Sequence, residues 1–242
     1  MRTRLRACIP PQLRLRVRCL RRWLVDWRDG SLPLLATSAA RQTHWPSQLT
    51  LQQPILPGVS VAAKLHNLRL AAASLNDREI PPGGILSLMR MLGEPSAKRG
   101  YRTSRMLVGG DLVQGEGGGL CQLSGLLYLL ALHAGLGIVE RHAHSCDIYT
   151  EDTRFCPLGS DATLVYGYKD LRLRNTLPFS VAFRVETADD ALSASLCAPQ
   201  PVAQRRVEFL RRDESPDTRT VCTRVDGHEV WSDRYRILLP AP

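Results

Sequence analysis

Residues 115–135 read Gly-Glu-Gly-Gly-Gly-Leu-Cys-Gln-Leu-Ser-Gly-Leu-Leu-Tyr-Leu-Leu-Ala-Leu-His-Ala-Gly, and no other part of the chain constrains its architecture as strongly. After the glycines, the run from Leu120 to Ala134 is apolar on nearly every face of a helix. Such a helix is ~20 Å long, which is too short to cross a membrane, so it belongs in the interior of a globular domain. Gly135 and Gly137 can end it in a left-handed turn. The sequence therefore predicts a buried central helix with a glycine-rich entrance.

The segments on either side of this helix differ in character. Upstream, the apolar spacing in 64–74 predicts a helix, and 106–108 predicts a strand that ends at a hairpin turn in 109–111. Downstream, alternating apolar residues predict short strands at 138–149, 164–168, 171–174, 181–185 and 192–196, and further antiparallel strands within 205–239 with a turn at 226–227. This order predicts an α+β fold, with a buried central helix packed on a mainly antiparallel sheet.

The positive charge of the chain is concentrated at its N-terminus. The net charge is +9, and residues 1–30 hold nine arginines against two acidic residues. The fold itself is nearly neutral, which argues against specific recognition of nucleic acid. We expect the basic arm to form a helix against the body, with a charge that suits an anionic membrane surface or an acidic partner protein. Residues 31–60 are rich in Ser, Thr, Pro and Gln, so residues 1–60 are interpreted as an arm and a linker.

Two further features concern the cellular compartment. No segment reaches the ~20 apolar residues that span a bilayer, and no apolar stretch of ~7–15 residues follows the basic start as a secretory signal requires. These patterns predict a cytoplasmic protein, or one that is peripheral at the membrane. The seven cysteines are odd in number and irregular in spacing, which favours free thiols.

Two motifs resemble those of the VanW family: Gly-Gly-Gly-Leu-Cys-Gln at 117–122 and Glu-Arg-His-Ala-His-Ser at 140–145. Weaker matches flank them, and together they cover about residues 66–200. We therefore place a VanW-like domain at 61–200 and a C-terminal β extension at 201–242. The family is named for an accessory gene found beside glycopeptide-resistance genes. The resemblance implies a role in the cell envelope and in glycopeptide resistance, but it implies no particular reaction.

The chain departs from the family pattern in two places. Residues 83–88 read Gly-Gly-Ile-Leu-Ser-Leu where relatives usually carry Gly-Glu-x-Phe-Ser-Phe, so one carboxylate is missing. After Cys-Gln, residues 124–128 read Ser-Gly-Leu-Leu-Tyr where relatives often carry Ser-Thr-Thr-Leu-Tyr. If the missing carboxylate belongs to a site, that site is altered in this chain.

Cys121 stands at the start of the buried helix, directly after Gly117, Gly118 and Gly119. Unpaired N–H groups and the dipole at a helix N-terminus favour a thiolate over a thiol. Glycines let the backbone approach a ligand closely. We expect the N–H groups near Gly119 and Cys121, with the side-chain amide of Gln122, to form an oxyanion site.

Candidate partners for Cys121 follow it along the chain. His142 and His144 alternate in the predicted strand, so both imidazoles would lie on one face, and Asp161 opens a later strand. A cysteine at a helix start followed by histidine and aspartate on strands matches the layout of papain-like and transglutaminase-like enzymes, by analogy. Cys121 would be the nucleophile, one histidine the base and Asp161 the group that orients it. With the envelope context that the resemblance implies, the expected substrate is an amide bond in a peptide of a peptidoglycan precursor, and no cofactor is needed.

Two alternatives remain open at this point, so the sequence leaves undecided whether the protein is an enzyme. The first is a tetrahedral zinc site formed by the four side chains of Cys121, His142, His144 and Cys146. The second is a non-catalytic module that binds envelope peptides or a partner protein. In that module the thiol and the imidazoles are structural, and Arg141 with the two histidines binds a carboxylate.

Overall fold

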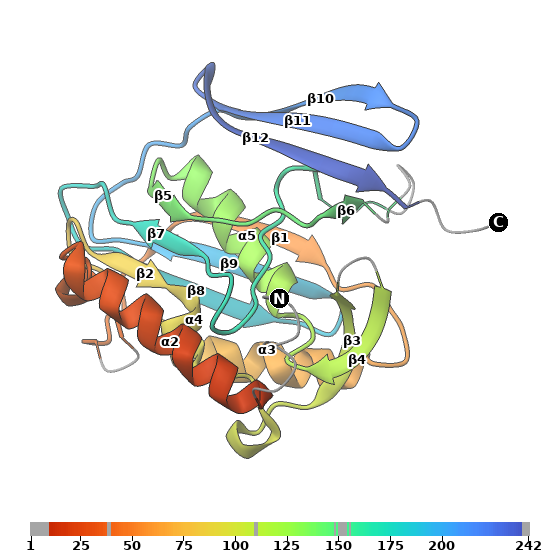
Figure 1. The fold of residues 1–242 in the computed structure, drawn as a ribbon. Helices are drawn as coiled ribbons and strands as arrows, with labels where there is room; N and C mark the ends of the chain where they lie inside the picture. Colours follow the sequence, from red (N-terminus) through yellow and green to blue (C-terminus); the bar gives the residue numbers. More distant parts are fainter. Residues whose placement is uncertain are drawn as a thin grey trace.

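The computed structural model describes residues 10–37, 40–108, 111–147, 149, 154 and 156–238, and it has a mixed architecture of helices and mostly antiparallel sheets (Figure 1). This confirms the predicted α+β class. The helices of this part are α2 (Pro11–Arg28), α3 (Val61–Leu75), α4 (Leu88–Leu92) and α5 (Leu120–His133), with short 3-10 turns at Leu32–Leu34 and Ala97–Arg99. The strands are β1 (Ser47–Pro54), β2 (Ile85–Ser87), β3 (Thr103–Val108), β4 (Asp111–Glu116), β5 (Gly137–Glu140), β6 (Cys146–Asp147), β7 (Arg172–Arg174), β8 (Ala182–Thr187), β9 (Ala191–Cys197), β10 (Val207–Ser215), β11 (Thr218–Val225) and β12 (His228–Ile237).

Helix α5 forms the centre of the core. It packs on the sheet with strand order β1-β9-β8, and α3 packs beside it against the same sheet. Leu123, Leu126 and Tyr128 on α5 are 0% exposed, as are Leu192 and Leu196 on β9. The predicted buried central helix is confirmed, because an apolar run on every face can bury all of its side chains only between other elements.

Several predicted strands and turns are also confirmed. β8 and β9 pair antiparallel with Phe183 opposite Leu196, and β10, β11 and β12 form consecutive antiparallel strands. The turn between β11 and β12 places Asp226 and Gly227 at φ of +50° and +84°, a backbone conformation that these residue types tolerate best. β3 and β4 form the expected pair, whereas the turn predicted at Gly109-Gly110 lies outside the described residues.

Three predictions of local structure are wrong. The strand predicted at 138–149 ends at Glu140, and the chain pairs again only at Cys146–Asp147, in a different sheet. The segment 164–168 forms a turn, with Gly167 at φ +79° and a bridge between Val165 and Lys169. Within the predicted linker, residues 47–54 form β1, because an edge strand can pair with β9 and still end in a proline.

The two ends of the described chain both contact the body. Helix α2 lies along the edge of the molecule beside β2 and α4 (Figure 1), as expected for a helix packed on the fold. At the other end, β12 pairs with β6 and so joins the C-terminal sheet to the segment that follows β5. In the described part of the chain, every helix is too short or too polar to cross a bilayer.

Candidate functional site

The entrance to α5 brings Cys121 to the edge of the core. Gly117 and Gly119 adopt left-handed φ values of +86° and +99°. A Cβ on Gly119 would lie 2.9 Å from the Cγ of Lys64, so only glycine fits this close approach. The side chain of Cys121 follows in the first turn of the helix and is half-buried.

The first turn of α5 offers free backbone donors. The N–H of Leu123 donates to the carbonyl of Gly119, at 3.1 Å. Within the described part of the chain, the N–H groups of Cys121 and Gln122 have no backbone acceptor. Free N–H groups are expected at a helix start, and they can bind a developing oxyanion. The side-chain amide of Gln122 has a different role from the one predicted, because its Nε2 donates to the carbonyl of Pro54, at 2.9 Å.

His144 and Asp161 are held together beside the thiol. The Oδ2 of Asp161 accepts from the backbone N–H of His144 at 2.6 Å and lies 2.8 Å from its Nδ1. Nδ1 is thus engaged by Asp161, and the side chain of Cys121 also interacts with the imidazole of His144. The Sγ of Cys121 also lies 3.9 Å from the carbonyl oxygen of Leu164, on the segment that follows Asp161. Three separate segments therefore place a thiol, an imidazole and a carboxylate in one chain of contacts.

The environment favours the charged forms of His144 and Asp161. Burial disfavours the imidazolium, but hydrogen bonds to Asp161 and Cys121 and the negative charges of both groups outweigh it and raise the pKa of His144 to about 10. Burial likewise opposes ionisation of Asp161, but His144 and the guanidinium of Arg141 lower the pKa of this carboxyl to about 2. The pair is an imidazolium–carboxylate ion pair at neutral pH.

A second layer of contacts fixes Asp161. The Nε of Arg141 donates to its backbone carbonyl at 2.7 Å, and the hydroxyl of Tyr235 donates to its Oδ1 at 2.6 Å. The guanidinium of Arg141 is 0% exposed, pairs with Asp233 and lies over the ring of Tyr128, 4.8 Å from the centroid. Arg141 was predicted to bind a ligand carboxylate, but its buried guanidinium instead binds carboxylates of this chain.

Tyr235 and Asp233 were not predicted from the sequence. Both lie on β12, in the C-terminal sheet, more than 70 residues after Asp161. Nothing in a strand of ordinary composition signals that two of its side chains belong to a distant site. The signal comes from the structure, because the buried guanidinium of Arg141 requires more than one acceptor.

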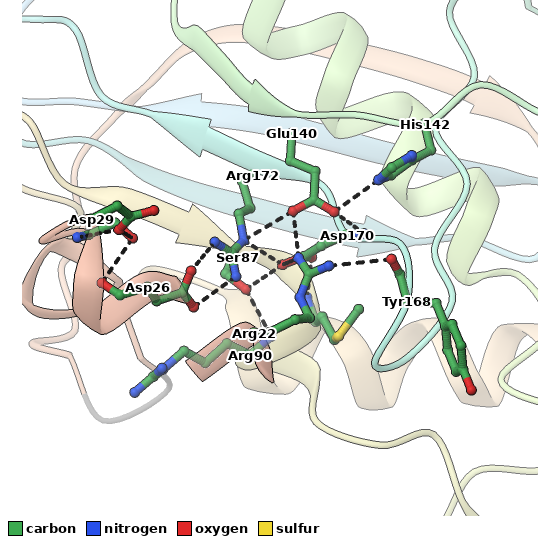
Figure 2. A network of polar contacts seen from close by, with 12 residues as sticks. Arg22, Asp26, Asp29, Ser87, Arg90, Glu140, His142, Tyr168, Asp170 and Arg172 are labelled. Atoms are coloured by element: carbon green, nitrogen blue, oxygen red, sulfur yellow. Dashed lines mark hydrogen bonds and ion pairs between the residues drawn. The ribbon is translucent and has the colours of Figure 1, made fainter. Parts of the chain in front are cut away.

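His142 points to a different cluster. Its Nε2 lies 2.9 Å from the Oε1 of Glu140, and Glu140 also binds Arg22 of α2 and Arg172 of β7 (Figure 2). Hydrogen bonds from Arg22 and His142 outweigh burial and lower the pKa of Glu140. The structure therefore brings His144, and not His142, to Cys121.

The structure does not bring the four residues of the alternative zinc site together as a ligand set. Cys146 is buried and its Sγ lies 3.4 Å from the hydroxyl of Ser145. Within the described ranges, no three His, Cys, Asp or Glu side chains are placed to hold a metal ion. The chemistry that this arrangement supports is that of a thiol with an acid–base partner.

The space in front of the thiol is small. A pocket of about 30 Å³ is lined by Cys121, Gly117 and Glu116, together with apolar or aromatic side chains that include Leu164 and Tyr166. This volume holds about one water molecule. A larger hollow of about 430 Å³ lies between α2 and α4 and shares Met89, Gly93 and Tyr166 with the first.

Comparisons with known proteins identify the family. The family described as "VanW like protein" matches residues 63–197. The chain is 32% identical over 154 residues to the Vancomycin B-type resistance protein VanW of Enterococcus faecalis, covering 61% of this chain and 56% of that protein. It is 28% identical over 143 residues to the uncharacterized protein YoaR of Bacillus subtilis, covering 59% and 46%. The chain thus spans about half the length of these relatives, and no solved structure matches it. Because the matched segment makes up more than half of the chain and contains Cys121, His144 and Asp161, the protein belongs to the VanW family, which includes a member named for vancomycin resistance.

Proposed function

We propose that this protein is a cysteine-dependent enzyme that breaks or exchanges an amide bond, with Cys121 as the nucleophile. The observation that carries the proposal is the contact chain from the Cys121 thiol through the His144 imidazole to the Asp161 carboxylate, whose last link is 2.8 Å long. A nucleophile, a base and a group that orients the base are the three parts that such chemistry needs. The position of the thiol at the start of α5 adds unpaired N–H groups.

Each step can be assigned to a group of this chain. In the reactive form that we propose, the proton of the Cys121 thiol has passed to the imidazole of His144, and the sulfur attacks the carbonyl carbon of the amide. The carbonyl oxygen becomes an oxyanion that accepts hydrogen bonds from the N–H groups of Cys121 and Gln122. His144 then donates its proton to the leaving nitrogen, the C–N bond breaks, and a thioester and a free amine result. Water or a second amine, deprotonated by His144, attacks the thioester carbonyl, the C–S bond breaks, and the acyl group leaves. Cys121 is released as a thiolate beside protonated His144, which restores the starting pair.

Asp161 has a positioning role in this scheme. By accepting from Nδ1 and from the backbone N–H of His144, it leaves Nε2 available to the sulfur and stabilises the imidazolium. Arg141 and Tyr235 hold Asp161 in turn, so that the carboxylate cannot rotate away.

The substrate that we propose is a peptide amide of a cell-wall precursor. The support is the family, since one relative is named for resistance to vancomycin. The pocket of about 30 Å³ beside the thiol admits only a small substituent, so the scissile bond would lie next to a small side chain. Glu116 lines the same pocket and would favour a substrate that carries an amine.

The decisive experiment measures alkylation of each cysteine by iodoacetamide between pH 5 and pH 10, with peptide mass spectrometry. We expect Cys121 of the folded protein to be alkylated at pH 6–7, where an ordinary thiol with a pKa near ~8.5 is mostly protonated. His144→Gln should slow the reaction at pH 7 by at least about tenfold, and the matched variant His142→Gln should leave it unchanged. If Cys121 stays inert until the protein unfolds, or if both variants react alike, the enzyme proposal fails.

The surroundings of the thiol also favour a second candidate function, a non-catalytic module that binds peptides. The Sγ of Cys121 lies 3.9 Å from the carbonyl oxygen of Leu164, and a half-buried thiol can serve packing alone. The two functions separate in Cys121→Ser, which keeps the size of the side chain. An enzyme would lose turnover of cell-wall peptides in this variant, whereas a binding module would keep its affinity for them.

A further inference from the structure

Helix α2 contacts the body through one face. Its residues that are not exposed are Leu15, Cys19, Arg22 and Asp26, which recur at helical spacing. Arg22 binds Glu140 at 2.5 Å, and Asp26 binds Arg172 through both of its oxygens, at 2.5 and 3.0 Å (Figure 2). These contacts fix which face of α2 is directed outward.

The outward face is divided lengthwise into two stripes. At about 100° per residue, six exposed apolar side chains fall within an arc of about 120°. They are Leu13, Val17, Leu20, Trp23, Leu24 and Trp27, with exposed fractions between 42% and 66%. Four exposed arginines, Arg14, Arg18, Arg21 and Arg28, occupy the adjacent arc, and Arg16 projects from within the apolar stripe.

Charge on this outward face has one sign. The acid within α2, Asp26, points inward and is 4% exposed. Arg18 lies over the ring of Tyr168, at 5.1 Å, and within the described residues no carboxylate pairs with Arg14, Arg21 or Arg28. A partner for this face must therefore supply negative charge beside a surface that accepts apolar side chains.

We propose that α2 binds the protein to the surface of an anionic membrane, with the axis of the helix in the plane of the interface. The apolar stripe would enter the boundary between headgroups and acyl chains, and the arginines would pair with lipid phosphates. Two tryptophans in the stripe suit this position, because the indole ring is apolar and its N–H is polar. An acidic protein would satisfy the arginines, but a stripe of six large exposed apolar side chains is better matched by a lipid boundary, where Arg16 can extend to the headgroups.

The test uses the full chain and vesicles of phosphatidylcholine, with or without 30% phosphatidylglycerol, in 0.1 M NaCl. We expect co-sedimentation with the anionic vesicles at least about tenfold stronger than with the neutral ones, together with a blue shift of tryptophan fluorescence. Leu24→Glu should weaken binding by on the order of tenfold, whereas Val230→Glu, which changes a 44%-exposed residue on β12, should not. Arg21→Gln should weaken it several-fold, compared with its matched control Arg212→Gln on β10.

Each variant must keep the thermal midpoint of the wild type by circular dichroism, so that loss of binding is not loss of folding. Failure of the wild type to sediment with anionic vesicles would overturn the proposal. The proposal would also be overturned if Leu24→Glu bound the anionic vesicles as strongly as the wild type, because the binding would then depend on charge alone. If the protein bound a soluble polyanion as strongly as the anionic vesicles, and without the blue shift of tryptophan fluorescence, the result would indicate an acidic partner and would also overturn the proposal.

Discussion

Replacing Asp161 with asparagine keeps the size of the side chain but removes the charge that faces His144. In the intact protein, Asp161 and Cys121 overcome the effect of burial and raise the pKa of His144 from 6.5 to about 10. At ~1.4 kcal/mol for each pKa unit, this net rise corresponds to on the order of 5 kcal/mol in favour of the imidazolium, after the opposing effect of burial. Among the groups that raise the pKa of His144, Asp161 has the largest effect. We therefore expect Asp161→Asn to lower this pKa by at least about two pKa units, to about 8 or below.

The measurement is an NMR titration of protein labelled with carbon-13 at histidine, with the signal of His144 assigned from His144→Gln. The wild-type signal should show no protonation change between pH 6 and 8.5, whereas the variant should begin to titrate in this range. Cys121→Ser should lower the pKa of His144 by less than Asp161→Asn does. The signal of His142, which contacts Glu140, should be the same in all variants. If wild-type His144 titrates near 6.5, the ion pair does not exist and the reasoning about this site is wrong.

The same pair sets a pH dependence of stability. The folded pKa of Asp161 is depressed to about 2, so its contribution is present above the unfolded value of 3.8 and is lost as the pH falls towards 2. The folded pKa of His144 is raised to about 10, so its contribution is full below 6.5 and is lost as the pH rises to 10. The difference in free energy of unfolding between wild type and Asp161→Asn, measured in urea, should therefore be largest between about pH 4 and 6.5.

Three further substitutions test the surroundings of Asp161, with the free energy of unfolding in urea as the readout. Arg141→Met should cost about 3–5 kcal/mol, because it leaves buried carboxylates without their cation; a cost below ~1 kcal/mol would contradict this. Tyr235→Phe should cost about 2 kcal/mol through the lost hydrogen bond to Asp161, and an unchanged midpoint would mean that the bond does not form. Gly125→Ala would place a Cβ 3.2 Å from the carbonyl oxygen of Ser160, so it should cost about 1–3 kcal/mol and slow alkylation of Cys121, whereas a stabilised variant would show that this backbone moves freely.

The core of the fold could be predicted from the sequence because its signal is local. A run of mostly apolar residues on nearly every face of a helix, directly after a glycine cluster, is accommodated by burial, and most side chains of α5 are buried. The alternation that predicted β8 and β9 is equally local. By contrast, β1 has a polar sequence and forms because β9 offers a free edge. That edge is almost 150 residues away along the chain, and no window of sequence contains it.

The candidate site shows the same division. The chemistry of Cys121, His144 and Asp161 is visible in the residue types and in their order along the chain. The prediction that His142 and His144 share a face assumed a continuous strand, but β5 ends at Glu140 and the alternation ends with it. Arg141 binds Asp233 and Tyr235, 92 and 94 residues further on, so its structural role depends on tertiary contacts that the sequence does not display.

The hydroxyl of Tyr235 donates a hydrogen bond to Oδ1 of Asp161, so the contacts of the candidate site extend beyond the segment that is similar to the family. The segment similar to the family ends at residue 197, yet the residues that hold Asp161 in place include two on β12. A protein cut at the end of the similar segment would keep all three candidate residues and lose the hydroxyl and the carboxylate that brace them. A relative that is similar only over that segment can therefore share the thiol, the imidazole and the carboxylate but lack the contacts that hold the carboxylate in place. A test of the candidate site in this chain should therefore use a chain that includes β12.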